Sequence, residues 1–352
     1  MDAFVHVCDD QAMHRASRRS VLASLGVILG SACRRRATPE SNGAPGISLP
    51  PEAPKPVHAD AAPEVAMVED APYPKTVAKE QIAAGELDLH DWSLPGDAKI
   101  GRRAVVLVPR HLAKGERVPL LLALHGLAET VDEEMGAYAW VRRYGIGDGY
   151  AHLRAKDTIT LQGLGKMATN ERIAELQATL AEKPFGGMVI ACPYTPNIWN
   201  VNPSVDATID AYTSWLFDVL VPRLRAETPV LAGAAHLGVD GVSLGGYASL
   251  GVGVRKTAEI GAIGCVQAAI STGDAEKWTD RIQKAFAKDG ARPLHLLTST
   301  ADVFRTPVEA LDKALTKRGI AHDARVAIGP HDQPFLRGPG SLEMLLWHAR
   351  HL

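Results

Sequence analysis

The stretch GVDGVSLGGYASLGVG, residues 238–253, places Ser243 among closely spaced glycines, after an apolar run and before a run of small residues. Gly241, Ser243, Gly245 and Gly246 form the pattern GxSxGG. Glycines are needed where a strand turns sharply into a helix, because a side chain would collide with nearby backbone. Such a turn exposes the serine hydroxyl at a helix N-terminus, which favours developing negative charge. The stretch predicts a strand, a turn and a helix, with Ser243 as a candidate nucleophile; the alternative is a turn of small residues with a capping serine.

Apolar and amphipathic stretches alternate along the chain on both sides of this turn. The strand-like runs are ELDLHDWSL (86–94), RAVVLVP (103–109), PLLLALHG (119–126), GMVIACPY (187–194), HLGVDGVS (236–243), IGCVQAAIS (263–271), LHLLTST (294–300) and ARVAIG (324–329). Helical periodicity marks 170–183, 205–226 and 306–318, and Ser204 is a candidate N-cap. Apolar strands that alternate with helices are typical of a mainly parallel sheet covered on both faces. We therefore expect an α/β fold.

Composition sets the broad class of the protein. The chain has 352 residues, is 46% hydrophobic and carries a formal net charge of −2. A sizeable buried core is available, and the charge balance gives no reason to expect a nucleic-acid partner. Cys192 and Cys265 lie in apolar, strand-like runs and are expected to be buried thiols. No CxxC pair is present, so neither a zinc site nor a disulfide framework is expected.

Residues 1–33 have the pattern of an export signal. Arg18 and Arg19 precede an apolar stretch, residues 21–29, and small residues end at Cys33. The apolar stretch is far shorter than the ~20 residues of a membrane-spanning helix, which favours a cleaved signal. The paired arginines resemble a twin-arginine signal, and the small residues before Cys33 resemble a lipoprotein cleavage site, whose cysteine is acylated. The alternative is an N-terminus without targeting meaning.

A tether and a single folded domain are expected after this signal. Residues 34–75 are rich in Pro, Ala, Glu and Gly without sustained periodicity, which is typical of a solvated linker. The folded domain is expected over 76–352. Translation starts at Met1 or at Met13, and the second choice removes acidic residues from the signal. We expect a periplasmic or cell-envelope lipoprotein held to the membrane through an N-terminal lipid.

One segment, about 128–187, is too long for a simple strand connection and contains several aromatic residues. Structureless loops of that length are uncommon, so we expect an inserted cap. Ligands of α/β sheets bind at the carboxyl ends of the strands, where such an insertion would overhang the site. Trp140 within the segment and Trp199 after the run 187–194 are candidate substrate contacts. For Trp199, a packing role is the alternative.

A serine nucleophile needs a general base, and the base needs an acid that orients it. Asp302 and His331 each lie just past the end of a strand-like run, so we expect both beside Ser243. Asp332 and Glu309 are the alternative acids. Asp332 is adjacent to the base and poorly placed to reach its ring, and Glu309 lies within the following helix.

An oxyanion hole is the remaining requirement. The backbone N–H groups of Leu127, after a strand end, and of Leu244, after the nucleophile, are the candidates. His125 is interpreted as a structural residue that supports this loop. His348 and His351 form an HxxH pattern on a terminal helix, which we interpret as a solvated end instead of a metal site.

Together these residues resemble the α/β-hydrolase superfamily, and within it the esterase group that includes feruloyl esterases, acetylxylan esterases and S-formylglutathione hydrolase. The likeness lies in LHG (124–126), GVSLGGYASL (241–250), STAD (299–302) and GPHDQPFLRGPG (329–340), and it covers roughly 86–352. The resemblance implies Ser243 as nucleophile, His331 as general base, Asp302 as its partner, and no cofactor or metal. The long segment after Leu127 departs from compact members of the group, so their substrate cannot be transferred.

The expected activity is hydrolysis of small-molecule or polymer-linked carboxylic esters through an acyl-enzyme. A serine peptidase or a thioesterase is an alternative on the same fold, because a triad does not determine the leaving group. A binding lipoprotein without turnover is the alternative from another class.

Overall fold

The computed structural model describes residues 86–200 and 203–352. The predicted signal with Cys33 and the predicted tether, 34–75, lie outside these residues. Among the helices of the described ranges, none is both long and apolar enough to cross a membrane.

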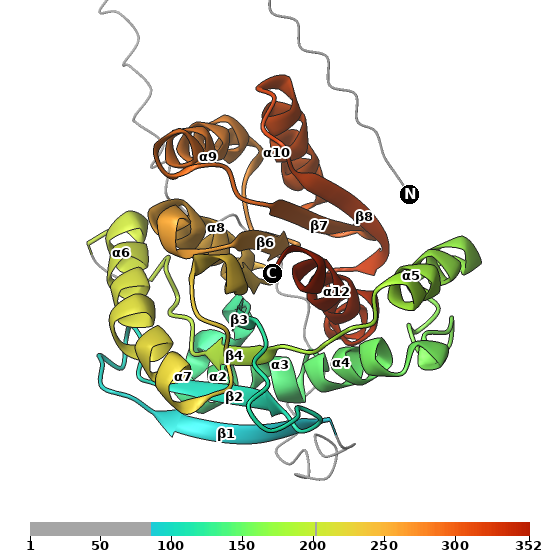
Figure 1. Cartoon of the computed structure of the whole chain (residues 1–352). Coiled ribbons are helices and arrows are strands. Elements are labelled where there is room, and N and C mark those ends of the chain that lie inside the picture. The colour runs from blue at the N-terminus through green and yellow to red at the C-terminus, as the bar shows by residue number, and fades with distance from the viewer. Residues whose placement is uncertain (1–85, 201–202) are drawn as a thin grey trace, which may run out of the picture. The chain divides into compact units, whose positions relative to one another are not determined.

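Eight strands form one sheet in the order β1-β2-β4-β3-β5-β6-β7-β8 (Figure 1). β2 pairs antiparallel with β1 and β4, and all other neighbouring strands pair in parallel. Each of the eight strand-like runs overlaps one of these strands, and the predicted mainly parallel sheet is confirmed. The strands are β1 (Leu87–Ser93), β2 (Arg103–Pro109), β3 (Leu120–Leu124), β4 (Val189–Pro193), β5 (Leu237–Gly241), β6 (Ala262–Val266), β7 (Leu294–Ala301) and β8 (Asp323–Pro330).

Helices cover both faces of this sheet, and two separate hydrophobic clusters lie beneath them (Figure 1). The first cluster is covered by α6 (Val205–Trp215), α7 (Val221–Glu227), α8 (Leu244–Arg255), α9 (Ala275–Asp289) and α10 (Arg305–Lys317). The second is covered by α2 (Glu133–Ala137), α3 (Ala139–Arg142), α4 (Ile146–Arg154), α5 (Asn170–Glu182), α11 (Gln333–Phe335) and α12 (Ser341–His351).

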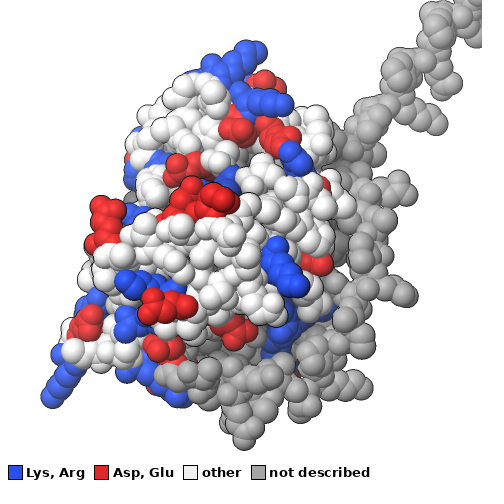
Figure 2. Space-filling view, turned by 90° about the vertical axis from the view of Figure 1, so that its right-hand side faces the viewer, with Lys and Arg blue, Asp and Glu red and all other residues white. Residues whose placement is uncertain are grey.

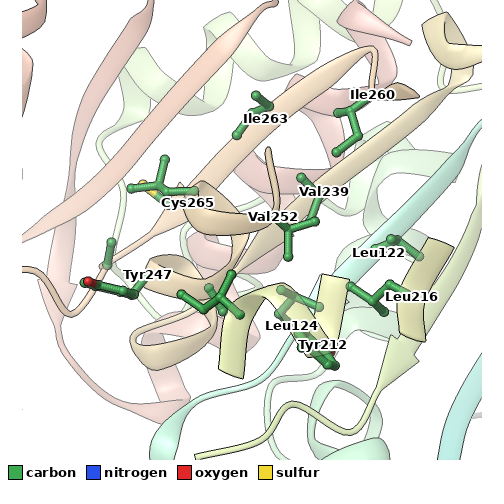
Figure 3. Packing of buried hydrophobic residues seen from close by; sticks show 14 of the residues in the cluster. Leu122, Leu124, Tyr212, Leu216, Val239, Tyr247, Val252, Ile260, Ile263 and Cys265 are labelled. Atoms are coloured by element: carbon green, nitrogen blue, oxygen red, sulfur yellow. The ribbon is translucent and has the colours of Figure 1, made fainter. Parts of the chain in front are cut away.

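The central strands are apolar because both of their faces are covered. Every residue of β3, β4, β5 and β6 is buried, as the continuous apolar runs predict for parallel strands. Figure 3 shows how α8 joins this core: Val252 lies near Val239 of β5, and Leu124 of β3 packs in the same cluster. Cys192 and Cys265 are buried free thiols, as predicted. The core therefore fixes α8, and with it the turn at Ser243, to the middle of the sheet.

The stretch 205–226, predicted as one helical segment, is helical without a gap, but its hydrogen-bonding pattern changes in the middle. Ser204 caps α6 as predicted, because its hydroxyl accepts the Ala207 N–H at 3.1 Å. A π-helical turn, Leu216–Leu220, then separates α6 from α7. Pro222 lies at the start of α7 and lacks an N–H group, so the regular helical hydrogen bond cannot continue there.

The segment between β3 and β4, predicted as an inserted cap, packs its aromatic residues against a face of the sheet. Trp140, Tyr144 and Tyr150 are buried in the same cluster as Leu121 of β3 and Ile190 of β4. The physical reason is that this face of the central strands is apolar and needs cover. The aromatic residues pack on this face and exclude water from it, instead of facing a crevice.

Charged side chains of both signs are interspersed on the face seen in Figure 2, with uncharged surface between them. A continuous basic stripe, which would follow a nucleic-acid backbone, is not seen on that face.

Candidate active site

Ser243 occupies the turn between β5 and α8 in a strained conformation. Its φ and ψ are 57° and −117°, in a region that non-glycine residues rarely adopt. The backbone around it compensates: Ser243 N–H donates to Val266 O at 3.0 Å, and Ser243 O accepts the Ala269 N–H at 2.9 Å. Ser243 is partly exposed, whereas Val242 and Leu244 on either side are buried. The turn thus holds one hydroxyl at the surface of a rigid core.

Two glycines make this turn possible. A Cβ atom on Gly241 would lie 2.4 Å from Gly245 O, and a Cβ atom on Gly245 would lie 2.3 Å from Leu124 O. Both distances are far too short for any side chain, so β5, α8 and the end of β3 approach each other only through glycine. This confirms the steric reason inferred from the sequence for the glycines around Ser243.

Asp302 and His331 form a hydrogen-bonded pair at the ends of β7 and β8. His331 Nδ1 lies 2.8 Å from Asp302 Oδ1. The Asp302 side chain is fully buried, whereas that of His331 is 23% exposed. Since the carboxylate can only accept, Nδ1 carries the proton and Nε2 is left as an acceptor. His331 therefore has the tautomer that a general base requires.

Asp302 is itself held by two donors. Thr298 Oγ1 donates to Asp302 Oδ2 at 2.6 Å, and the Phe304 N–H donates to Oδ1 at 2.9 Å. The Phe304 ring also packs edge-on against the His331 ring, with centroids 5.3 Å apart. These contacts fix both members of the pair.

The alternative acids have other partners. Asp332 caps α11, because its carboxylate accepts the Phe335 N–H at 2.9 Å. Glu309 pairs with Arg305 at 2.7 Å, one turn earlier on α10. The structure thus brings Asp302, and neither alternative, to the ring of His331.

The end of β3 lies beside the turn that holds Ser243, the candidate nucleophile. A Cβ atom on Gly126 would be 3.7 Å from Ser243 Cβ. Leu127 begins the 3-10 helix η1 (Leu127–Val131) and Leu244 begins α8. The first N–H groups of a helix have no acceptor within it, so both amides are available to a ligand. This arrangement can bind an oxyanion next to Ser243.

His125 supports this loop, as the sequence indicated. Its Nδ1 lies 2.8 Å from Gly126 O and its Nε2 accepts the Thr195 N–H at 2.8 Å. Complete burial lowers the pKa of His125 from its usual 6.5 to about 4. The ring is therefore neutral and serves as a structural link between the β3 and β4 ends.

The chain matches no family model and no curated protein. It does resemble solved structures. A ferulic acid esterase superposes with a TM-score of 0.56 at 16% identity, over 76% of this chain and 100% of that one. An S-formylglutathione hydrolase from Staphylococcus aureus gives 0.52 at 11% identity, over 75% and 99%. The feruloyl esterase module from Clostridium thermocellum, complexed with sinapinate, gives 0.51 at 12% identity, over 81% and 96%.

The chain has the α/β-hydrolase fold. Within this fold Ser243 follows β5, Asp302 follows β7 and His331 follows β8, each beyond the carboxyl end of a parallel strand. That edge of the sheet is where α/β folds bind ligands.

The two tryptophans predicted as substrate contacts have different positions in the α/β-hydrolase fold. Trp140 is completely buried in the core beneath α3, so it is a packing residue and the prediction is corrected. Trp199 is half-buried, and its ring packs edge-on against Tyr247, one turn after Ser243 on α8. Only Trp199 therefore stays a candidate substrate contact.

The terminal helix differs from the solvated end that its HxxH pattern suggested. His348 is completely buried, and its Nε2 lies 2.9 Å from a carboxylate oxygen of Asp240 on β5. His295 of β7 lies on the same carboxylate, with 3.9 Å between Nδ1 and Oδ2. Within the described residues, no group of ligating side chains could hold a metal ion. His348 therefore links β5, the strand before Ser243, to α12.

Sequence reasoning missed the groups that hold the candidate base and acid in place. Thr298 holds the acid, and Gln267 Nε2 donates to Ser299 Oγ at 2.7 Å and to Pro330 O at 2.8 Å, immediately before His331. Gln267 has a φ of 48°, which is unusual for a non-glycine residue. No local pattern marks either side chain: Thr298 bonds Asp302 at the end of its own strand, and Gln267 reaches across to residues of β7 and β8.

Proposed function

We propose that this chain is a serine hydrolase that cleaves carboxylic esters through an acyl-enzyme. The observation that carries the proposal is the hydrogen bond between the partly exposed His331 ring and the buried Asp302 carboxylate. It leaves a basic nitrogen in an α/β-hydrolase fold whose serine lies on a strained, partly exposed turn. A base oriented by a buried carboxylate is what a serine nucleophile requires.

The reaction would proceed in two halves. Ser243 Oγ attacks the carbonyl carbon while His331 Nε2 takes the hydroxyl proton, and the N–H groups of Leu127 and Leu244 bind the resulting oxyanion. The intermediate then expels the alcohol, which receives the proton from His331. Water, deprotonated by His331, attacks the acyl-serine, and the carboxylic acid leaves as Ser243 regains its proton. Asp302 keeps the ring oriented and stabilises the imidazolium formed in each half.

The proposed substrate class is a small-molecule or polymer-linked carboxylic ester. Support comes from the solved structures of the same fold, since two of those described above bear the names of ferulic or feruloyl esterases. Their identity to this chain is low, so the acyl and alcohol groups are to be found by assay. The proposed reaction needs no cofactor or metal.

The test is covalent labelling with a fluorophosphonate together with hydrolysis of p-nitrophenyl acetate. Wild-type protein is expected to react in both assays, and Ser243→Ala in neither. Ser249→Ala is the matched control, because Ser249 lies on the same helix with its hydroxyl bonded to Gly264 O at 2.7 Å. Labelling of Ser243→Ala would refute the proposed nucleophile.

A panel of a methyl ferulate, an acyl thioester and a peptide amide then separates the alternatives. A preference for the ester over the other two supports the proposal. Exclusive cleavage of the thioester or amide would replace it with a thioesterase or a peptidase, and binding without turnover of any substrate would favour the binding lipoprotein.

A further inference from the structure

Three polar residues are buried beside the proposed nucleophile and have no part in the mechanism above. Glu129, Arg143 and Tyr144 are 2%, 4% and 4% exposed. All three come from the segment between β3 and β4. Burial of a carboxylate and a guanidinium is costly unless each is paired, so such a cluster calls for a reason beyond packing.

At one end, this cluster holds the proposed oxyanion loop. Tyr144 Oη accepts the Gly126 N–H at 3.3 Å and donates to the Glu129 carboxylate through a short hydrogen bond. A Cβ atom on Gly126 would lie 3.1 Å from Tyr144 Oη, 3.3 Å from Glu129 Oε2 and 3.7 Å from Ser243 Cβ. The phenol and the carboxylate thus adjoin the nucleophile turn, one residue before Leu127.

At the other end, the cluster holds the loop of the base. Arg143 Nη1 lies 3.2 Å from Glu129 Oε1. With the Gln333 amide oxygen turned towards the guanidinium, Arg143 donates to it from Nε at 3.2 Å and from Nη2 at 2.6 Å. Gln333 follows His331 by two residues, and Arg337 Nε in turn donates to Arg143 O at 2.8 Å. A continuous series of contacts, buried at Tyr144, Glu129 and Arg143, therefore connects the loop after β3 with the loop after β8.

The charges of Glu129, Arg143 and Tyr144 are compatible with an oxyanion forming nearby. A lone carboxylate next to Ser243 would oppose the negative charge of a tetrahedral intermediate. Arg143 balances the charge of Glu129. Burial and the Glu129 carboxylate raise the pKa of Tyr144 well above its usual value, so its hydroxyl stays protonated and remains a donor. The cluster can fix the loop without adding net charge.

We propose that Glu129, Arg143 and Tyr144 position the Leu127 amide relative to Ser243 and His331, and so act on turnover more than on substrate binding. The inference rests on the proposed esterase function. None of the three touches the reacting atoms, so they are positioning residues. Their common effect is to hold the oxyanion loop and the base loop at one fixed separation.

The test is Tyr144→Phe, which removes the acceptor of the Gly126 N–H and the donor to Glu129. Loss of a whole oxyanion donor costs on the order of 10²–10³ in kcat, so a displaced donor is expected to cost ~10- to 100-fold. KM is expected to stay within about two-fold, because the substrate-binding surface is intact. The matched control is Tyr150→Phe, another buried tyrosine of the same core cluster, which should keep wild-type kcat.

Glu129→Gln is the second variant, in case the first does not fold. It keeps the shape but removes the charge, and it should lower kcat with KM nearly unchanged. Thermal unfolding of each variant separates positioning from stability. A folded Tyr144→Phe or Glu129→Gln protein with wild-type kcat overturns the inference, as does an equal loss in Tyr150→Phe. Such results leave the proposed function intact; only a wild-type protein that neither hydrolyses esters nor labels would refute both.

Discussion

At the scale of single residues, hydrogen bonds hold Asp302 and His331, two of the candidate catalytic residues, in one orientation. Asp302 uses one oxygen for Thr298 and the other for Phe304 N–H and His331. The imidazole consequently has a carboxylate on Nδ1 and a free Nε2. This arrangement distinguishes Asp302 from Asp332, whose carboxylate is occupied at the start of α11.

Asp302→Asn tests the role of that carboxylate. The substitution keeps the shape but favours the wrong imidazole tautomer, and the corresponding change in a serine protease lowers turnover by about 10⁴-fold. We expect kcat to fall by at least ~10² here, measured with p-nitrophenyl acetate, because neighbouring groups can compensate in part.

Asp332→Asn and Glu309→Gln are the matched controls for this prediction. Each should cost much less kcat, since one residue caps a helix and the other pairs with Arg305 on the surface of α10. If either abolished activity while Asp302→Asn stayed active, the acid would have to be reassigned.

At the scale of elements, α3 and α4 act as a cover for the sheet. Their aromatic side chains fill the space over β3 and β4, and α4 packs against α12. Trp199, by contrast, lies between β4 and α6 and contacts α8 near its start. We therefore expect truncation of Trp140 to affect mainly stability, and truncation of Trp199 to affect mainly the choice of substrate.

Trp140→Ala should lower the free energy of unfolding by about 3–5 kcal/mol, because it leaves a cavity in the core. The ranking of ester substrates should not change in the protein that remains folded. Urea unfolding and a panel of esters with acyl chains of different size provide the two measurements. A changed ranking with wild-type stability would restore Trp140 as a substrate contact.

Trp199→Ala should give the opposite result. Its half-buried ring contributes less to the core, so the stability loss should be smaller than for Trp140→Ala. Bulky acyl esters should lose more kcat/KM than the acetyl ester does. An equal loss for all esters would mean that Trp199 only supports α8.

At the scale of the whole molecule, the sheet is joined to its surroundings by buried histidines. His125 connects the ends of β3 and β4, and His348 connects α12 to Asp240 of β5. Burial lowers the pKa of both imidazoles. Both are therefore neutral in the folded protein at pH 7. Acid that protonates them should destabilise the contacts that they make with the sheet.

The free energy of unfolding should decrease as the pH falls below 6.5. In the unfolded chain a histidine takes up a proton near pH 6.5, whereas folded His125 resists protonation until about pH 4. The unfolded state thus binds more protons between these values, and stability is lost there as the pH falls. For His125 alone the loss amounts to about 3 kcal/mol by pH 4.

Urea unfolding at pH 7, 5 and 4 measures this loss. His125→Gln should flatten the pH dependence, whereas His90→Gln, at an exposed position of β1, should leave it unchanged. A wild-type protein as stable at pH 4 as at pH 7 would contradict the prediction.

The predicted export signal also bears on the whole molecule. We propose that Cys33 is acylated and holds an exported protein at the cell envelope. Full-length protein should then fractionate with membranes, and Cys33→Ala should release it or block its maturation, since a short apolar signal cannot anchor by itself. Cys192→Ala is the control, because that thiol is buried in β4. Soluble wild-type protein with an intact N-terminus would rule the anchor out.

The sequence by itself determined the strands, the main helices and the order of the site residues. Continuous apolar runs produce buried parallel strands wherever both faces are covered, and GxSxGG allows only a sharp turn between β5 and α8. Asp302 and His331 were predicted as candidates for the same reason, because residues just past the ends of parallel strands collect at one edge of the sheet, and the structure pairs them there. These inferences are local, or depend only on strand direction.

Only the tertiary structure decided where the long connection packs and which polar groups meet. Trp140 was taken for a substrate contact because an aromatic residue in an insertion has the same local pattern whether it faces solvent or a sheet. The contacts of Tyr144 with Gly126, and of His348 with Asp240, join residues 18 and 108 positions apart. No sequence periodicity or motif reveals such long-range pairs. They form because buried polar groups need hydrogen-bond partners, which the tertiary structure supplies.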